Sequence, residues 1–183
     1  MLKSSEYFQK HFDAASKVSD AEIDKILIQL QNAVKHNHKV FICGNGGSAL
    51  TASHYVTDWS KMLWSHKNEK LQAYCLNDNI GLFSAYANDV NFNEVFSNLL
   101  SQYASKDDIL ITISGSGNSQ NLVNALNVAK LLKLVTIGIV GFDGGKIKKL
   151  TDICIHYPVN DMQIAEDLHM SLGHILMKKL CSD

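Results

Sequence analysis

A turn rich in serine and glycine, residues 114–119, has the clearest capacity for binding chemistry in this sequence. It reads Ser-Gly-Ser-Gly-Asn-Ser and lies between an apolar run and a segment of helical periodicity. The hydroxyls of Ser114, Ser116 and Ser119, with the backbone amides at the start of the helix, can surround a compact dianion without a lysine or an arginine. Ser119 could instead act only as a helix N-cap, but that interpretation leaves the other two hydroxyls without a role. The turn therefore predicts a binding site for a phosphate monoester.

A second glycine-rich turn, residues 43–48, reads Cys-Gly-Asn-Gly-Gly-Ser and also joins an apolar run to a helical segment. Glycines let the backbone approach a ligand closely, and the N-terminus of the following helix carries unpaired N–H groups and a partial positive charge. The turn lacks the GxGxxG fingerprint of dinucleotide-binding proteins, and no Gly-Lys-Ser/Thr follows as in a nucleotide P-loop. It indicates a ligand-contacting turn, but not a nucleotide site.

Two histidines and two carboxylates could supply acid–base chemistry or bind a metal ion. His54 and Asp58 are four residues apart in a helical segment, so they share one helix face. In the last helical segment Glu166 and His174 are eight residues apart, roughly 12 Å along the axis and about 80° around it. They could share a metal ion only through inward-leaning side chains, unless residues of two subunits meet. Taken alone, a histidine and a carboxylate four residues apart are more often a surface or interhelix pair than a ligand set.

The elements that must position these residues alternate along the chain. Two segments with apolar residues at helical spacing come first, 3–17 and 21–36, and Asp20 is a candidate N-cap for the second. The strands expected after them are residues 39–43, 71–76, 108–113, 134–140 and 152–157, and the helices are 49–64, 80–87 with 92–103, 119–132, a short turn near 146–150, and 162–180. This alternation predicts an α/β fold with a parallel sheet, whose ligands bind beyond the carboxyl ends of the strands.

The composition fits one globular domain and excludes several classes of protein. The chain has 183 residues, 46% of them hydrophobic, and a formal net charge of -1, so nothing attracts it in bulk to nucleic acid or to an anionic membrane. Its cysteines form no CxxC pair, which argues against a thiolate metal site or a disulfide framework. No segment resembles a signal peptide or a membrane span, so we expect a cytoplasmic protein.

Four motifs together carry a resemblance. The sequence resembles the sugar isomerase (SIS) domain, and within it the bacterial phosphoheptose isomerase family. The motifs that carry this resemblance are the two glycine-rich turns, Gly-Phe-Asp-Gly-Gly-Lys-Ile at 141–147, and Ala-Glu-Asp-Leu-His-Met-Ser-Leu-Gly-His at 165–174. The similarity covers nearly the whole chain. It implies a flavodoxin-like three-layer sandwich with a five-stranded parallel sheet and two leading N-terminal helices. It also implies one SIS domain over residues 1–183 and a homotetramer packed in part through residues 1–37, with active sites at subunit interfaces.

The resemblance implies roles for individual residues as well. Phosphate is expected at Ser114, Ser116 and Ser119, with further ligand contacts at Asn45, Ser48 and Asp89. The family's metal and acid–base positions fall on His54, Asp58, Glu166 and His174, and one Zn²⁺ ion per subunit is implied. The chain departs from the family's pattern where Asp58 replaces a glutamate, Glu166 a glutamine and Gly115 a threonine. It also lacks an arginine expected shortly after the first carboxylate, near Lys61 and Met62.

The activity that follows from this resemblance is aldose–ketose isomerisation through an enediol. The expected reaction converts sedoheptulose 7-phosphate to D-glycero-D-manno-heptose 7-phosphate for surface heptose or lipopolysaccharide synthesis, with Asp58 and His174 as the acid–base pair. Three alternatives stay open. The chain could isomerise a different sugar phosphate, it could be a non-catalytic tetramer that associates with a replication initiator, or it could be a sugar-phosphate sensor.

Overall fold

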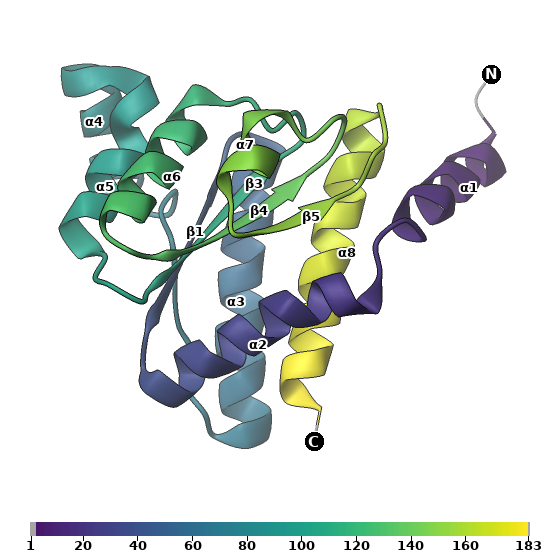
Figure 1. The fold of residues 1–183 in the computed structure, drawn as a ribbon, viewed down its shortest axis with the longest axis horizontal. Helices are drawn as coiled ribbons and strands as arrows, with labels where there is room; N and C mark the ends of the chain where they lie inside the picture. Colours follow the sequence, from purple (N-terminus) through teal and green to yellow (C-terminus); the bar gives the residue numbers. More distant parts are fainter. Residues whose placement is uncertain (1–2, 183) are drawn as a thin grey trace.

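A five-stranded parallel sheet lies at the centre of the computed structural model, which describes residues 3–182 (Figure 1). The strand order is β2-β1-β3-β4-β5, the flavodoxin-like order expected from the sequence. The strands are β1 (Lys39–Gly44), β2 (Gln72–Cys75), β3 (Ile109–Ser114), β4 (Val135–Val140) and β5 (Ile153–His156). The chain runs outward in opposite directions on the two sides of β1, so the carboxyl ends of β1 and β3 flank the point where ligands bind in such sheets.

Helices cover both faces of the sheet, as the βαβ alternation predicts (Figure 1). One layer consists of α2 (Asp20–His36), α3 (Gly47–Lys67) and α8 (Met162–Cys181), and the other of α5 (Val95–Tyr103), α6 (Gln120–Leu131) and α7 (Gly145–Leu150). The remaining helical segments are α1 (Ser4–Ala15), α4 (Ile80–Tyr86), a π-helical turn η1 (Ala87–Asn91) and a 3₁₀ turn η2 (Phe92–Glu94). In Figure 1 α1 and α4 lie at opposite sides of the molecule.

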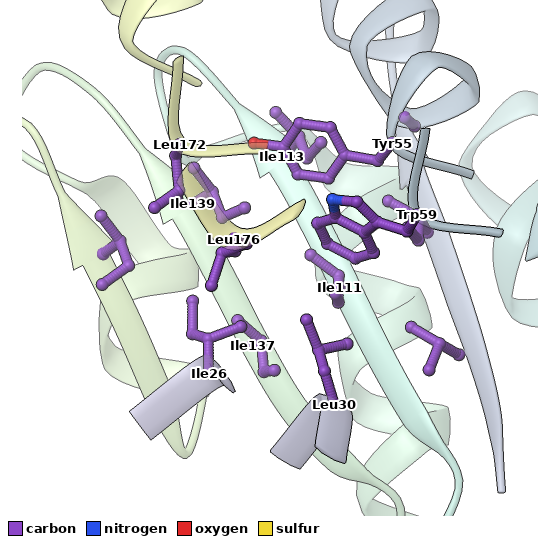
Figure 2. Close-up of a cluster of buried hydrophobic side chains, with 14 of the residues drawn as sticks. Ile26, Leu30, Tyr55, Trp59, Ile111, Ile113, Ile137, Ile139, Leu172 and Leu176 are labelled. Atoms are coloured by element: carbon purple, nitrogen blue, oxygen red, sulfur yellow. The ribbon is translucent and has the colours of Figure 1, made fainter. Parts of the chain in front are cut away.

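Alternation within each strand divides the core in two. Ile111 and Ile113 of β3 pack with α2, α3 and α8, whereas Leu110 points to the other face and packs with α5 and α6. Figure 2 shows the first of these clusters, where Tyr55 and Trp59 of α3 lie against β3 and the last helix. Each fully buried aliphatic or aromatic side chain in these clusters contributes about 1.5–3 kcal/mol of hydrophobic free energy. This burial stabilises the packing of both helical layers on the sheet.

The sequence-based prediction of Asp20 as an N-cap was wrong by one residue. Ser19 is the N-cap of α2, because its hydroxyl accepts the N–H of Glu22 while the Glu22 carboxylate accepts the N–H of Ser19 at 2.9 Å. This reciprocal capping box satisfies two backbone donors, and Asp20 becomes the first residue of the helix. The expected helix 92–103 also differs, since its first turn, η2, is 3₁₀ and the α-helix begins at Val95.

The first helix is tied to the last by one polar contact. The hydroxyl of Tyr7 donates to Asp167 at 2.7 Å, and this hydrogen bond raises the pKa of Tyr7 to about 12. Phe8 and Phe12 on the same helix are exposed, at 70% and 66% of their surface.

Among the helices of residues 3–182, none combines the length and the apolar composition needed to cross a membrane.

Candidate functional site

The serine-rich turn follows β3 directly and lines a cavity of about 300 Å³. Ser114 Oγ accepts the N–H of Gly117 at 3.1 Å, and Ser116 Oγ accepts the N–H of Asn118 at 3.3 Å. Because each hydroxyl oxygen is engaged as an acceptor, its own hydrogen is available to donate to a ligand. These serines are therefore prepared to act as donors to an anion.

Ser119 occupies the N-cap position of α6, but its side chain makes no capping hydrogen bond. Its hydroxyl lines the same cavity as the other two serines. The interpretation of Ser119 as a helix cap alone therefore has no support from its contacts.

The first glycine-rich turn forms the neighbouring wall of this cavity. β1 and β3 are hydrogen-bonded neighbours, with Gly44 opposite Ile113, so the two turns emerge side by side. Asn45 and the buried Ser48 line the cavity, and α3 starts at Gly47 without a side-chain cap. The first N–H groups of a helix attract negative charge. The sequence contains no arginine and no lysine lines the cavity, so hydroxyls, amides and helix dipoles supply its donors.

Glu166 and Met162 of α8 close the cavity on the far side. The Glu166 carboxylate lies so close to the first turn of α3 that a Cβ at Gly47 would be 2.6 Å from its Oε1. Met162 likewise covers Gly115, where any Cβ would overlap its sulfur. The glycines at these two positions therefore leave room for the ends of the Glu166 and Met162 side chains.

His54, Asp58 and His174 form a second group of functional side chains, further along the same two helices. His54 Nε2 lies 3.3 Å from Asp58 Oδ2 and 3.0 Å from His174 Nε2, and His174 Nε2 lies 3.6 Å from the same carboxylate oxygen. The three ligand atoms lie within 4.8 Å of one another. Two imidazoles and one carboxylate are a donor set that catalytic zinc sites use, with a position left for water or substrate. The residues present thus fit a divalent metal ion.

Close packing between α3 and α8 brings this group together. The Tyr55 hydroxyl donates to the carbonyl of His169, and Trp59 Nε1 donates to the carbonyl of Gly173 at 3.0 Å. A Cβ at Gly173 would overlap the ring of Tyr55. Since His174 follows Gly173 directly, these contacts determine where its imidazole lies relative to His54 and Asp58.

Comparison with known proteins shows the family of this chain. A family model described as SIS domain matches residues 6–141. A phosphoheptose isomerase of Helicobacter pylori is 33% identical over 175 residues, which are 96% of this chain and 88% of the relative. One of Aliarcobacter butzleri is 35% identical over 178 residues, 96% of this chain and 87% of the relative. The chain belongs to the phosphoheptose isomerase family of SIS-domain proteins.

Solved structures extend the likeness to three dimensions. The phosphoheptose isomerase of Neisseria gonorrhoeae superposes with a TM-score of 0.88 at 26% sequence identity, covering 96% of this chain and 95% of that one. The phosphoheptose isomerase of Francisella tularensis gives a TM-score of 0.87 at 23% identity, covering 98% of both chains, and supports the fold. The α/β SIS fold expected from the sequence motifs is confirmed.

The four residues to which the resemblance assigns metal and acid–base roles divide into two places. Three of them converge, but Glu166 lies outside the group of ligand atoms within 4.8 Å and lines the serine cavity instead. Glu166 and His174 are eight positions apart, which separates them by roughly 12 Å along α8. Asp58, one methylene shorter than the glutamate that the resemblance implies, nevertheless reaches both histidines from one turn beyond His54.

Asp89 lies apart from both groups within this chain. It is an exposed residue of η1, where its carboxylate accepts a hydrogen bond from Asn88 at 2.7 Å, and it lines neither the serine cavity nor the histidine cluster. Its predicted contact with a ligand stays a prediction.

Several residues that shape the site gave little sign in the sequence. Asn121 of α6 pairs with Asn45, and Tyr55, Trp59 and Gly173 fix α3 against α8. A helical glycine such as Gly173, next to a candidate histidine, was the one available signal, because glycine weakens a helix and is kept where close packing demands it.

Proposed function

We propose that this protein is an aldose–ketose isomerase that converts sedoheptulose 7-phosphate to D-glycero-D-manno-heptose 7-phosphate. The observation that carries the proposal is the convergence of His54, Asp58 and His174 on the two helices whose first turns line the serine cavity. An anion-binding end and an acid–base end then lie along one pair of helices. That arrangement suits a substrate with its phosphate at one end of a carbon chain and its carbonyl near the other.

The cavity supplies binding energy at the phosphate end. Ser114, Ser116 and Ser119 donate their hydroxyl hydrogens to the phosphate, and the N-terminus of α3 adds partial positive charge. Because this end does not react, its binding energy serves to hold C1 and C2 against the acid–base groups.

Asp58 and His174 move the proton at the other end. The carboxylate of Asp58 removes a proton from C1 of the ketose while the C2 oxygen gains one, which gives a neutral enediol. Return of a proton to C2 and loss of the C1 hydroxyl proton then yield the aldose. His174 serves the transfers at oxygen, because histidine is the side chain that most often acts as a general acid–base group in enzymes.

We further propose that His54, Asp58 and His174 hold one Zn²⁺ ion per subunit. The bound ion would polarise the substrate's carbonyl and stabilise negative charge on its oxygen. The donor set and its spacing support this assignment.

The active unit we propose is a homotetramer that acts in the cytoplasm, in the synthesis of surface heptose. The large exposed apolar side chains of α1 and α4, Phe8, Phe12 and Ile80, support burial against other subunits. The separate position of Asp89 supports a contribution from its segment to a neighbouring subunit's site.

A substrate panel tests the proposed reaction. Purified protein supplied with Zn²⁺ is given heptulose, hexulose and pentulose phosphates, and aldose formation is measured in a coupled assay. Turnover of sedoheptulose 7-phosphate with kcat/KM well above that of the shorter ketoses is expected. If none of the substrates is turned over, the proposed reaction is wrong.

The Asp58→Ala variant separates an isomerase from a sensor. Loss of a positioned acid–base group typically lowers kcat by about 10²–10⁴-fold, while the serine cavity and its affinity for the phosphate are retained. If wild-type protein binds sugar phosphate tightly but neither it nor the variant turns it over, the protein is a sensor. Capture of a replication initiator by a protein without isomerase activity would favour the scaffold.

A further inference from the structure

Asn121, the second residue of α6, is a buried amide with only 1% of its surface exposed. Its Nδ2 donates to Asn45 Oδ1 at 2.9 Å, and Asn45 Nδ2 donates back to Asn121 Oδ1 at 2.9 Å. The two amides thus form a closed pair with two hydrogen bonds. A buried amide without partners would cost free energy. The pairing with Asn45, together with the Leu122 N–H that Asn121 Oδ1 also accepts at 3.0 Å, therefore stabilises Asn121 in the interior.

The pair joins the two turns that form the serine cavity. Asn45 belongs to the glycine-rich turn after β1, while Asn121 follows the serine-rich turn after β3 by two residues. Within residues 3–182, no other side-chain hydrogen bond connects these two turns. The pairing of β1 with β3 places the two turns side by side, and beyond the strand ends this side-chain contact links them.

Asn45 keeps hydrogen-bonding capacity after pairing. An amide nitrogen carries two N–H groups and the oxygen two lone pairs, and the pair uses one of each. Asn45 is half-buried and lines the cavity, whereas Asn121 does not. Any effect of Asn121 on a ligand must therefore pass through Asn45.

We infer that Asn121 is a positioning residue for phosphate binding, which holds the Asn45 amide in the orientation that presents its second N–H to the phosphate. This inference rests on the proposed function and specifies how its anion site is assembled. Without Asn121, the Asn45 side chain can rotate, and the phosphate loses one preorganised donor.

The substitution Asn121→Asp changes one terminal NH₂ to an oxygen and adds a negative charge, so its effect is compared with that of the uncharged Asn121→Ala, which tests the positioning role alone. The new carboxylate has no N–H to donate, so one of its oxygens faces the Asn45 carbonyl oxygen in either orientation of the Asn45 amide. Asn121→Ala removes both groups without adding charge, and serves if the aspartate variant fails to fold. Asn127→Leu, at an exposed position of the same helix with no role in the site, is the matched control.

Calorimetric titration with inorganic phosphate measures the effect without requiring turnover. We expect Asn121→Asp and Asn121→Ala to weaken phosphate binding by about tenfold, the size of one lost hydrogen bond to a charged group, with Asn127→Leu unchanged. In an Asn45→Ala background, Asn121→Ala should weaken binding no further. With sedoheptulose 7-phosphate, KM should rise while kcat changes little.

Two results would overturn the inference. One is wild-type phosphate affinity in the folded Asn121 variants, and the other is an Asn121→Ala effect of equal size with and without Asn45. Failure of the proposed function would give a different result. If the protein isomerises no sugar but its phosphate binding still depends on Asn121, the proposed function is wrong and this inference stands.

Discussion

At the scale of single residues, the site uses side chains already committed to the local backbone. Ser114 and Ser116 accept N–H groups of their own turn, which orients their hydroxyls before a ligand arrives. Ser119 has no such bond, so its hydroxyl is free to serve the ligand alone. An anion site built this way needs little reorganisation when phosphate binds.

Substitution of Ser119 distinguishes a ligand contact from a helix cap. Because its side chain makes no capping bond, we expect Ser119→Ala to leave the melting temperature unchanged within about 1 °C and to raise KM for the sugar phosphate about tenfold. Thermal unfolding and steady-state kinetics measure the two effects. The reverse pattern, a lower melting temperature with unchanged KM, would identify Ser119 as a cap.

Glu166 places a negative charge beside the proposed phosphate. Its carboxylate shares the cavity with the three serines, and like charges at such short range repel even through an effective dielectric constant of about 20. Glu166→Gln should therefore tighten binding of inorganic phosphate by about tenfold at neutral pH. Calorimetry measures the change, and Glu69→Gln on the surface away from the cavity is the control. Weaker phosphate binding in Glu166→Gln would mean that the carboxylate supports the site, for example through a metal ion.

At the scale of elements, the pairing of α3 with α8 makes the histidine cluster. Each helix separately carries a pattern that the sequence displays, His54 with Asp58 and Glu166 with His174. Which of these four side chains meet depends on the crossing of the helices, and a hydrophobic pattern predicts a buried face but not the depth of the contact. The contact of Gly173 with the Tyr55 ring sets that depth.

A larger residue at Gly173 should change the packing of α3 against α8 and so displace the side chains of the histidine cluster. A Cβ at this position overlaps Tyr55, so Gly173→Ala forces α3 and α8 apart and should lower the free energy of unfolding by about 1–3 kcal/mol. Zn²⁺ affinity should fall with it. Gly81→Ala in α4 is the control, since its Cβ would have no neighbour nearer than 3.6 Å. Chemical denaturation and metal titration provide the measurements. A Gly173→Ala variant as stable as the wild type would contradict this prediction, because it would show that α3 and α8 accommodate the extra methyl group without loss of stability.

At the scale of the whole molecule, the core contains a buried histidine that has no function in the proposed reaction. His169 of α8 is 1% exposed, and neither ring nitrogen has a hydrogen-bond partner within residues 3–182. Burial lowers its pKa to about 4, and the nearby backbone at Val140 offsets this only in part. The ring is therefore neutral in the folded protein at neutral pH, where it packs near Tyr157.

This histidine should make global stability dependent on pH. The unfolded chain binds the proton with a pKa near 6.5 and the folded chain only near 4. Stability is therefore complete above pH 6.5 and falls between pH 6.5 and 4, by up to about 3 kcal/mol at the lower limit. His169→Phe should be less sensitive to pH in this interval. Urea denaturation of both proteins across the range tests this, and parallel curves would contradict the assignment.

The sequence by itself determined the α/β class, the strand-to-helix turns and the serine site, because hydrophobic periodicity and glycine-serine turns are local properties of the chain. It missed Ser19 as a cap by one residue, and it gave no sign of the Asn45–Asn121 pair. Only the tertiary structure decided that His54, Asp58 and His174 meet while Glu166 joins the serine cavity. The physical reason is that contacts between helices depend on packing between residues more than 100 positions apart, such as Tyr55 and Gly173, which no local pattern records.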